Sequence, residues 1–124
     1  MELLLDTHIL IWWLTDDKHL SKRARAAVAD AARVHVSPVS AWEIEMKKAR
    51  GRLTAPNNLE ATIRAHGMQP LPITIAHGIA AGQLPLLHRD PFDRMLIAQA
   101  SIESLTLMTA DEQIRKYNVP VLMV

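Results

Sequence analysis

The sequence predicts an α/β fold built around a parallel sheet. Short apolar runs alternate with longer segments in which apolar residues recur every three or four positions, a pattern typical of βα units. No repeat, low-complexity tract or linker divides the 124 residues, so we expect one domain spanning residues 1–124. A hydrophobic fraction of 49% is enough for one packed core.

Five short apolar runs are predicted to form the strands. They are Glu2–Leu5, Val34–Val36, Gln69–Leu71, Leu105–Met108 and Val121–Met123. Such short strands are common in α/β domains. Helical segments lie between most of them, so we expect neighbouring strands to run parallel.

Seven segments with helical periodicity occupy the intervals. They are His8–Leu14, Ser21–Ala32, Pro38–Arg50, Leu59–Ala65, Ile75–Gln83, Pro91–Glu103 and Ala110–Tyr117. Gly51 and Gly67 stand where two of these helices are expected to end, because glycine readily takes the left-handed conformation that closes a helix. The segment Leu84–Arg89 is predicted to be a loop.

Three of the helix starts have a recognisable cap. Ser37–Pro38 and Asp90–Pro91 each place a capping side chain before a proline in the first helical position. Thr109–Glu112 has the form of a capping box and predicts the start of the last helix.

Charge and composition narrow the class of protein. The formal net charge is +1 and cysteine is absent, so the charge does not by itself indicate nucleic acid, and disulfides and thiolate metal sites are excluded. No apolar run approaches the ~20 residues that a membrane span requires. The first residues lack a basic leader and are interrupted by Asp6 and His8, so we expect no signal peptide and a cytoplasmic location.

Three acids stand where strands end or helices begin. Asp6 closes the first apolar run, Asp93 lies in the first turn of a predicted helix, and Asp111 follows the apolar run that ends at Met108. Ligands of open α/β sheets bind at the carboxyl ends of the strands. Acids that converge there make an anionic pocket that is costly without a cation, which is the requirement of a Mg²⁺ or Mn²⁺ site acting on a phosphodiester.

Each of these acids also has a structural interpretation. Carboxylates in the first turn of a helix stabilise its dipole, which would account for Asp93 and Asp111, and Asp6 has the position of an N-cap. Asp93 heads the apolar stripe of its helix whereas Asp90 lies off it. We therefore interpret Asp90 as the cap and Asp93 as the functional acid.

Glu43 is the fourth acid, and its position is harder to explain structurally. If its helix begins at Pro38, Glu43 lies in the second turn, on the same side as Val39, Trp42 and Met46. A carboxylate beside a buried stripe needs a partner or a cation. The alternative is a later helix start, in which Ser40 and Glu43 would form a capping box.

Histidines and tryptophans give weaker indications. The six histidines show no paired spacing typical of zinc. His8 follows Asp6 closely and is either a substrate contact or a local contact at a helix start. Trp12 and Trp13 are adjacent, so one helix face cannot bury both. We expect one in the core and the other at an interface.

Four stretches of the chain resemble the PIN-domain ribonucleases, and specifically the VapC-type toxins of toxin–antitoxin pairs. The matching stretches are Leu3–His8, Ser37–Ile44, Asp90–Ala100 and Leu107–Asp111. The resemblance covers essentially the whole chain, although Leu53–Gln83 matches only loosely. It implies a three-layer α/β/α sandwich around a parallel sheet. It also implies RNA cleavage that depends on one or two Mg²⁺ or Mn²⁺ ions.

The resemblance also assigns roles to particular residues. It makes four acids both catalytic and metal-binding, namely Asp6, Glu43, Asp93 and Asp111. It places Thr7 and Thr109 beside these acids as supports. An antitoxin partner, an RNA substrate and a homodimer are implied as well. The four glycines offer no phosphate cradle, which disfavours a nucleoside-triphosphate enzyme.

A basic cluster follows the Glu43 helix and consists of Lys47, Lys48, Arg50 and Arg52. It has two interpretations of equal weight. The cluster either contacts RNA phosphates or is a solvated helix end favoured by the helix dipole.

Two other functions compete with the nuclease. A receiver domain, which accepts phosphate in signalling, also uses an acidic Mg²⁺ site. It requires adjacent acids after the first strand, an Asp after the third and a Lys after the fifth. Here Asp6 stands alone, Leu71–Ile73 contains no Asp, and no Lys follows Val121. The second alternative is a non-catalytic RNA-binding protein whose acids are helix caps.

Overall fold

A five-stranded parallel sheet forms the centre of the computed structural model, which describes residues 1–124. The strands are β1 (Glu2–Leu5), β2 (Arg33–Val36), β3 (Gln69–Pro70), β4 (Thr106–Thr109) and β5 (Val121–Met123). All pair in parallel in the order β3-β2-β1-β4-β5. This order differs from the 2-1-3-4-5 order of flavodoxin-like folds, which argues against the receiver alternative.

Six α-helices and one 3₁₀ helix surround the sheet. They are α1 (Thr7–Leu14), α2 (Lys22–Asp30), α3 (Pro38–Ala49), α4 (Leu59–Ala65), α5 (Ile75–Gln83), α6 (Pro91–Glu103) and η1 (Glu112–Lys116). The first six agree with the predicted helices apart from their end residues. None of them combines the length and apolar character that a membrane crossing requires.

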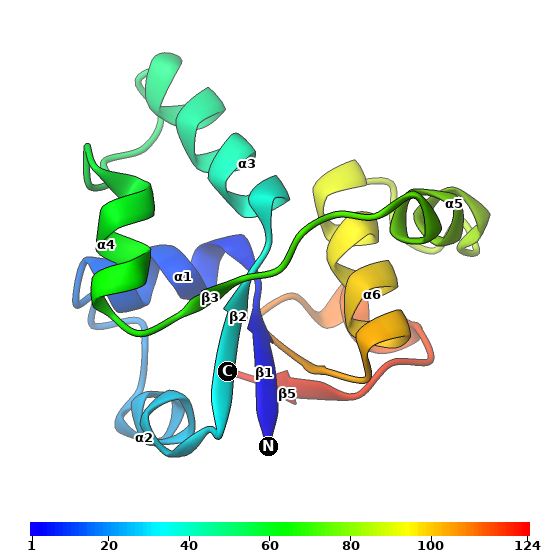
Figure 1. Ribbon diagram of the computed structural model, residues 1–124, viewed down its shortest axis with the longest axis horizontal. Helices are drawn as coiled ribbons and strands as arrows, with labels where there is room; N and C mark the ends of the chain where they lie inside the picture. The colour runs from blue at the N-terminus through cyan, green and yellow to red at the C-terminus, as the bar shows by residue number, and fades with distance from the viewer.

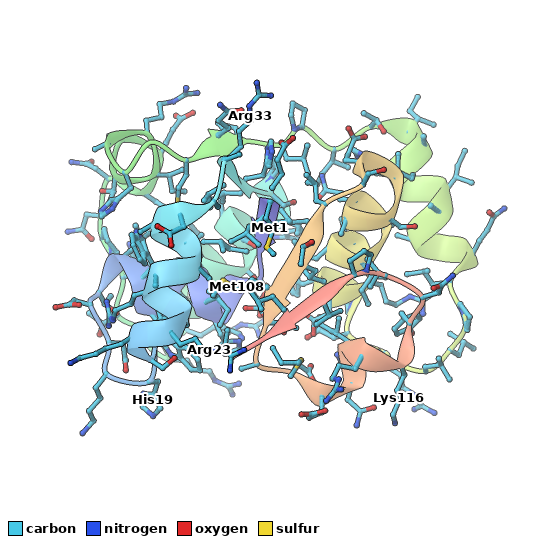
Figure 2. The ribbon with its side chains drawn as sticks, turned by 90° about the horizontal axis from the view of Figure 1, so that it is seen from below. Met1, His19, Arg23, Arg33, Met108 and Lys116 are labelled. Atoms are coloured by element: carbon cyan, nitrogen blue, oxygen red, sulfur yellow. The ribbon has the colours of Figure 1, made fainter.

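The helices form two layers, one on each face of the sheet, as Figures 1 and 2 show. Leu3 and Leu5 of β1 belong to a core cluster that includes residues of α1, α2 and α4, whereas Leu4 belongs to a second cluster with α6 and η1. Successive strand residues point to opposite faces, so burial of both faces requires the continuous apolar run Leu3–Leu5. The three-layer α/β/α sandwich is therefore confirmed.

The last predicted helix, Ala110–Tyr117, was wrong in both type and start. Thr109 is a strand residue, and its hydroxyl donates to Asp6 and accepts from the backbone N–H of Asp111. Because this hydroxyl is already engaged, Asp111 is the cap instead, and its carboxylate accepts from the N–H of Gln113 at 2.9 Å. Only the short 3₁₀ helix η1 follows.

The buried side of α3 is rotated from its predicted position. Trp42 is 64% exposed and packs against the ring of Phe92, whereas Ser40 and Ile44 are fully buried. Ser40 and Ile44 are four residues apart and so share one face, and a shift of one residue turns a helix face by ~100°. Trp42 was therefore wrongly placed on the apolar stripe, while Val39 was placed correctly.

Neither tryptophan of the α1 pair is fully buried, contrary to the prediction of one core residue. Trp12 stacks on His19 with ring centroids 5.3 Å apart. Trp13 instead donates from Nε1 to Nδ1 of His66 at 3.1 Å. Both rings pack against the core from its margin, because adjacent helical residues diverge by ~100°.

Arg94 anchors the loop that leads into α6. Its guanidinium donates to four backbone carbonyls, those of Ala81 (2.9 Å), Leu84 (2.9 Å), Pro85 (3.0 Å) and His88 (3.3 Å). A planar guanidinium carries five N–H donors in a fixed fork. One side chain therefore satisfies several carbonyls of a segment that has no regular structure of its own.

Tyr117 holds the same loop from the other side. Its hydroxyl donates to the carbonyl of Pro85 at 2.7 Å and accepts from the N–H groups of Leu87 (3.2 Å) and His88 (2.8 Å). The phenol ring is buried in the second core cluster. The backbone of His88 is thus fixed at its N–H by Tyr117 and at its carbonyl by Arg94.

We expect Arg94→Lys to destabilise the protein by about 1 kcal/mol, because a lysine cannot serve four carbonyls and leaves part-buried acceptors without a donor. Urea denaturation measures the loss. The matched control is Arg115→Lys, since Arg115 is exposed and pairs only with Glu112 at 3.3 Å. Equal, small losses in the two variants would contradict the anchoring role.

Candidate metal centre

A cavity of about 340 Å³ contains all four predicted acids. Its lining comes from α1, from the second and third turns of α3, from the start of α6 and from the turn after β4. Its lining residues are Asp6, His8, Trp12, Glu43, Lys47, His88, Asp90, Asp93, Ala110 and Asp111. Acids that are far apart in the sequence therefore share one space, as the parallel topology predicts.

Asp6 is buried, with 4% of its surface exposed. One carboxylate oxygen accepts from the N–H of Ile9 at 2.9 Å and caps α1. The other accepts from the hydroxyl of Thr109. Burial raises the pKa of Asp6, and these two hydrogen bonds oppose that rise. Asp6 is thus both an N-cap and a member of the cavity.

Glu43 is also buried, at 4% exposure, and lies in the second turn of α3. The helix begins after the Ser37 cap, so the alternative start at Ser40 is wrong. Lys47, one turn further along, donates to the Glu43 carboxylate at 2.7 Å. Glu43 therefore has a positively charged partner, the Lys47 ammonium, within the cavity.

Asp90 and Asp93 divide two tasks at the start of α6. The Asp90 side chain accepts from the N–H groups of Phe92 (2.9 Å) and Asp93 (3.5 Å) and so caps the helix. The Asp93 side chain is 17% exposed and turns toward the cavity. Burial, with the nearby charges of Asp90 and Asp6, raises the Asp93 pKa to about 7.

Asp111 has one oxygen for the backbone and one for the site. Oδ1 caps η1 through the N–H of Gln113. Oδ2 faces His88, whose Nε2 lies 3.0 Å away. The same Nε2 lies 2.9 Å from Oδ2 of Asp93. His88 therefore connects two acids that come from different elements.

His88 is the residue that sequence reasoning missed. It falls in the segment Leu84–Arg89, which was predicted only as a loop, and the histidines were tested only for paired zinc spacing. The useful signal was its position two residues before the Asp90 cap, since a residue there lies beside the first turn of α6, where Asp93 stands.

Thr109 and Thr7 occupy different places around the acids. Thr109 contacts Asp6 directly and also accepts from the N–H of Asp111 at 3.0 Å. The hydroxyl of Thr7 instead donates to that of Ser40 at 3.1 Å, joining α1 to α3. Thr7 thus acts on the site through the helix that carries Glu43.

The four residues of the basic cluster have different surroundings in the structure. Lys47 lines the cavity. Lys48 faces elsewhere, since its ammonium donates to the carbonyl of Pro56 at 3.1 Å and lies 3.7 Å from Glu45. Arg50 and Arg52 are exposed beyond the end of α3. His8, which was interpreted as either a substrate contact or a local helix-start contact, is exposed and lines the cavity.

A larger cavity of about 630 Å³ lies between α3 and α4. Its acids, Glu45 and Glu60, are exposed helix residues, and Glu45 has Lys48 as a partner. We place the site in the smaller cavity because buried acids converge there. The volume of a cavity does not by itself indicate a functional site.

The donor set of the smaller cavity fits a divalent cation. Carboxylate oxygens are the ligands that Mg²⁺ and Mn²⁺ prefer. One ligand atom each from His88, Asp93 and Asp111 can be chosen so that all three lie within 4.8 Å of one another. Burial is the main cause that raises the pKa of both Asp6 and Asp93, and a bound cation would favour their charged forms.

Comparison with known proteins gives the family. The sequence profile described as PIN domain matches residues 3–120. Ribonuclease VapC22 of Mycobacterium tuberculosis (strain ATCC 25618 / H37Rv) is 27% identical, with 94% of this chain and 92% of the relative covered.

Solved structures share the fold. The structure of VapBC2 from Rickettsia felis bound to a promoter DNA fragment matches with a TM-score of 0.71 at 13% identity, covering 99% of this chain and 98% of that chain. VapBC-5 of Mycobacterium tuberculosis matches with a TM-score of 0.63 at 19% identity, with coverage of 99% and 98%. The profile match extends over nearly the whole chain, and the chain therefore belongs to the PIN-domain family.

Proposed function

We propose that this protein is a divalent-metal-dependent endoribonuclease and the toxin of a toxin–antitoxin pair. The observation that carries the proposal is the convergence of Asp6, Glu43, Asp93 and Asp111 in one cavity. Family membership supports it, as does the relative that is named a ribonuclease. The alternative of a non-catalytic RNA-binding protein does not account for two buried acids, Asp6 and Glu43, on one cavity wall.

Asp6, Asp93 and Asp111 are the residues that would hold Mg²⁺ or Mn²⁺. Such an ion supplies positive charge for the phosphoryl oxygens and activates water for hydrolysis. Asp6 is oriented by Ile9 and Thr109, so it needs little rearrangement. Glu43, held by Lys47, faces the same space and is suited to orient the attacking water.

The proposed protein partner is an antitoxin. Matched structures are described as toxin–antitoxin complexes, including one from Klebsiella pneumoniae. An antitoxin must prevent RNA from reaching the cavity, and a basic side chain placed beside the acids would do so. The homodimer implied by the family resemblance stays a prediction.

Four single substitutions should each lower RNA cleavage by roughly 100-fold or more, as loss of one charge-stabilising group typically does. They are Asp6→Asn, Glu43→Gln, Asp93→Asn and Asp111→Asn. Double variants should lose little more than singles because the residues act as a unit. Cleavage rates in Mg²⁺ and in Mn²⁺ measure the effect, and sequencing of RNA ends after brief expression identifies the substrate.

Glu45→Gln is the matched control for Glu43→Gln. Glu45 lies on the same helix two residues away, but it is exposed and outside the 340 Å³ cavity. It should retain wild-type cleavage. Near wild-type activity in Asp93→Asn would show that the metal-site assignment is wrong.

Asp93→Asn should raise the melting temperature of the metal-free protein at about pH 8. Between pH 3.8 and about 7 the folded state holds a proton on Asp93 that the unfolded chain has released. The free energy of unfolding therefore falls as the pH rises through this window. Asparagine removes that penalty, and each kcal/mol recovered is worth about 4 °C.

Metal should have the opposite effect on the same two proteins. At a hundredfold excess over its dissociation constant, Mn²⁺ stabilises the native state by about 2.7 kcal/mol, and Asp93→Asn should show a smaller response. Thermal melts with chelator and with Mn²⁺ make the comparison. If Asp93→Asn melts at a lower temperature than the wild type in chelator and is stabilised equally by Mn²⁺, Asp93 is only a helix-start acid and not part of a metal site.

Arg50 and Arg52 should contact RNA phosphates, since they are exposed beyond the helix that carries Glu43 and Lys47. In an inactive Asp93→Asn background, Arg50→Ala/Arg52→Ala should make the log–log salt dependence of RNA binding shallower by roughly 0.7 for each lost contact. Lys48→Ala is the control, because Lys48 is held by Pro56. An unchanged slope would leave only the solvated-helix interpretation.

A further inference from the structure

We propose that His88 is a positioning residue of the metal centre, whose Nε2–H is donated to Asp111 and lies against Asp93, and so holds these two metal-binding carboxylates in place. The proposal rests on the proposed function, since it assigns a task toward the metal. It adds a residue that is neither acidic nor a metal ligand to the constellation of four acids.

The position of the imidazole carries the argument. Nε2 lies 2.9 Å from Oδ2 of Asp93 and 3.0 Å from Oδ2 of Asp111, and the side chain is 16% exposed. Asp93 belongs to α6 and Asp111 to the turn after β4. Nε2 donates to Asp111 and lies between the two oxygens, so the ring keeps both oxygens turned toward one point.

The contact made by Nδ1 of His88 indicates whether Nε2 is a hydrogen-bond donor or a metal ligand. Nδ1 accepts from the backbone N–H of Asp90 at 3.4 Å. In a neutral imidazole one nitrogen accepts and the other carries the proton. With Nδ1 as the acceptor, Nε2 bears the hydrogen and has no lone pair for a metal. His88 is therefore suited to support the ligands, as partners of metal-bound carboxylates generally do.

The surrounding loop fixes His88 independently of its side chain. Tyr117 accepts from the His88 N–H at 2.8 Å, and Arg94 donates to the His88 carbonyl at 3.3 Å. A side chain whose backbone is held at both polar groups loses little further entropy when it forms its contacts. The loop anchored by Arg94 and Tyr117 thus places the His88 ring between the two carboxylates.

Equilibrium binding of Mn²⁺, followed by the electron paramagnetic resonance signal of the free ion, tests the proposal without any reaction. His88→Ala should weaken Mn²⁺ binding by roughly 10- to 100-fold. His88→Gln should restore most of the affinity, because its amide also offers an N–H donor and carries no charge at any pH. Tyr117→Phe, which frees the His88 backbone, should weaken binding in the same direction.

His35→Ala is the matched control. His35 is 12% exposed, and its Nε2 lies 3.0 Å from Glu2, at the opposite end of β1 from Asp6. It should leave Mn²⁺ affinity unchanged. Circular dichroism and melting in chelator establish that each variant is folded. Because His88→Gln retains the larger part of the contact, it keeps the test valid if His88→Ala fails to fold.

Several outcomes overturn the positioning role. Wild-type affinity in His88→Ala would do so, as would equal losses in His88→Ala and His88→Gln. A ¹⁴N coupling in the pulsed resonance spectrum of bound Mn²⁺ that disappears in His88→Gln would make His88 a ligand instead. If the wild type binds no Mn²⁺, the proposed function fails with it, whereas failure of the His88 variants alone leaves the proposed function intact.

Discussion

The site depends on one constraint, which is that a carboxylate must be kept buried at the end of the central strand. The N–H of Asp6 continues the parallel ladder to Met108 at 3.0 Å, and its side chain begins α1 and accepts from β4. The strand, the helix and the neighbouring strand therefore meet at one residue. Burial raises the pKa of Asp6. The hydrogen bonds that oppose this rise are the same ones that fix the orientation of the carboxylate.

The other helix-start acids also divide helix capping from contacts in the cavity. Asp111 caps η1 with one oxygen and faces His88 with the other. Asp90 takes the capping task at α6, which leaves Asp93 turned toward the cavity. Structural and functional interpretations of a helix-start acid are therefore compatible, because a carboxylate has two oxygens and a cap needs only one.

Local sequence patterns predicted the parts of the fold that depend on neighbouring residues. The apolar runs and the Ser37 and Asp90 caps fixed the strands and most helix starts, and strand ends predicted where Asp6 and Asp111 would meet. Trp42 was misplaced because one residue of helix rotation exchanges a buried for an exposed face. His88 was missed because its position depends on Arg94 and Tyr117, and contacts between distant residues have no periodic pattern.

The acids of the cavity differ in the partners that their carboxylates have. Lys47 pairs with Glu43, and the His88 ring lies between Asp93 and Asp111. Asp6 has only neutral donors, Ile9 and Thr109. Asp6 is thus a buried acid without an ion-pair partner, and an added cation would offset the cost of burying its charge. In the proposed site a divalent ion would supply that charge from the space that Asp6 shares with Asp93 and Asp111, while Lys47 and His88 would orient the carboxylates beside them.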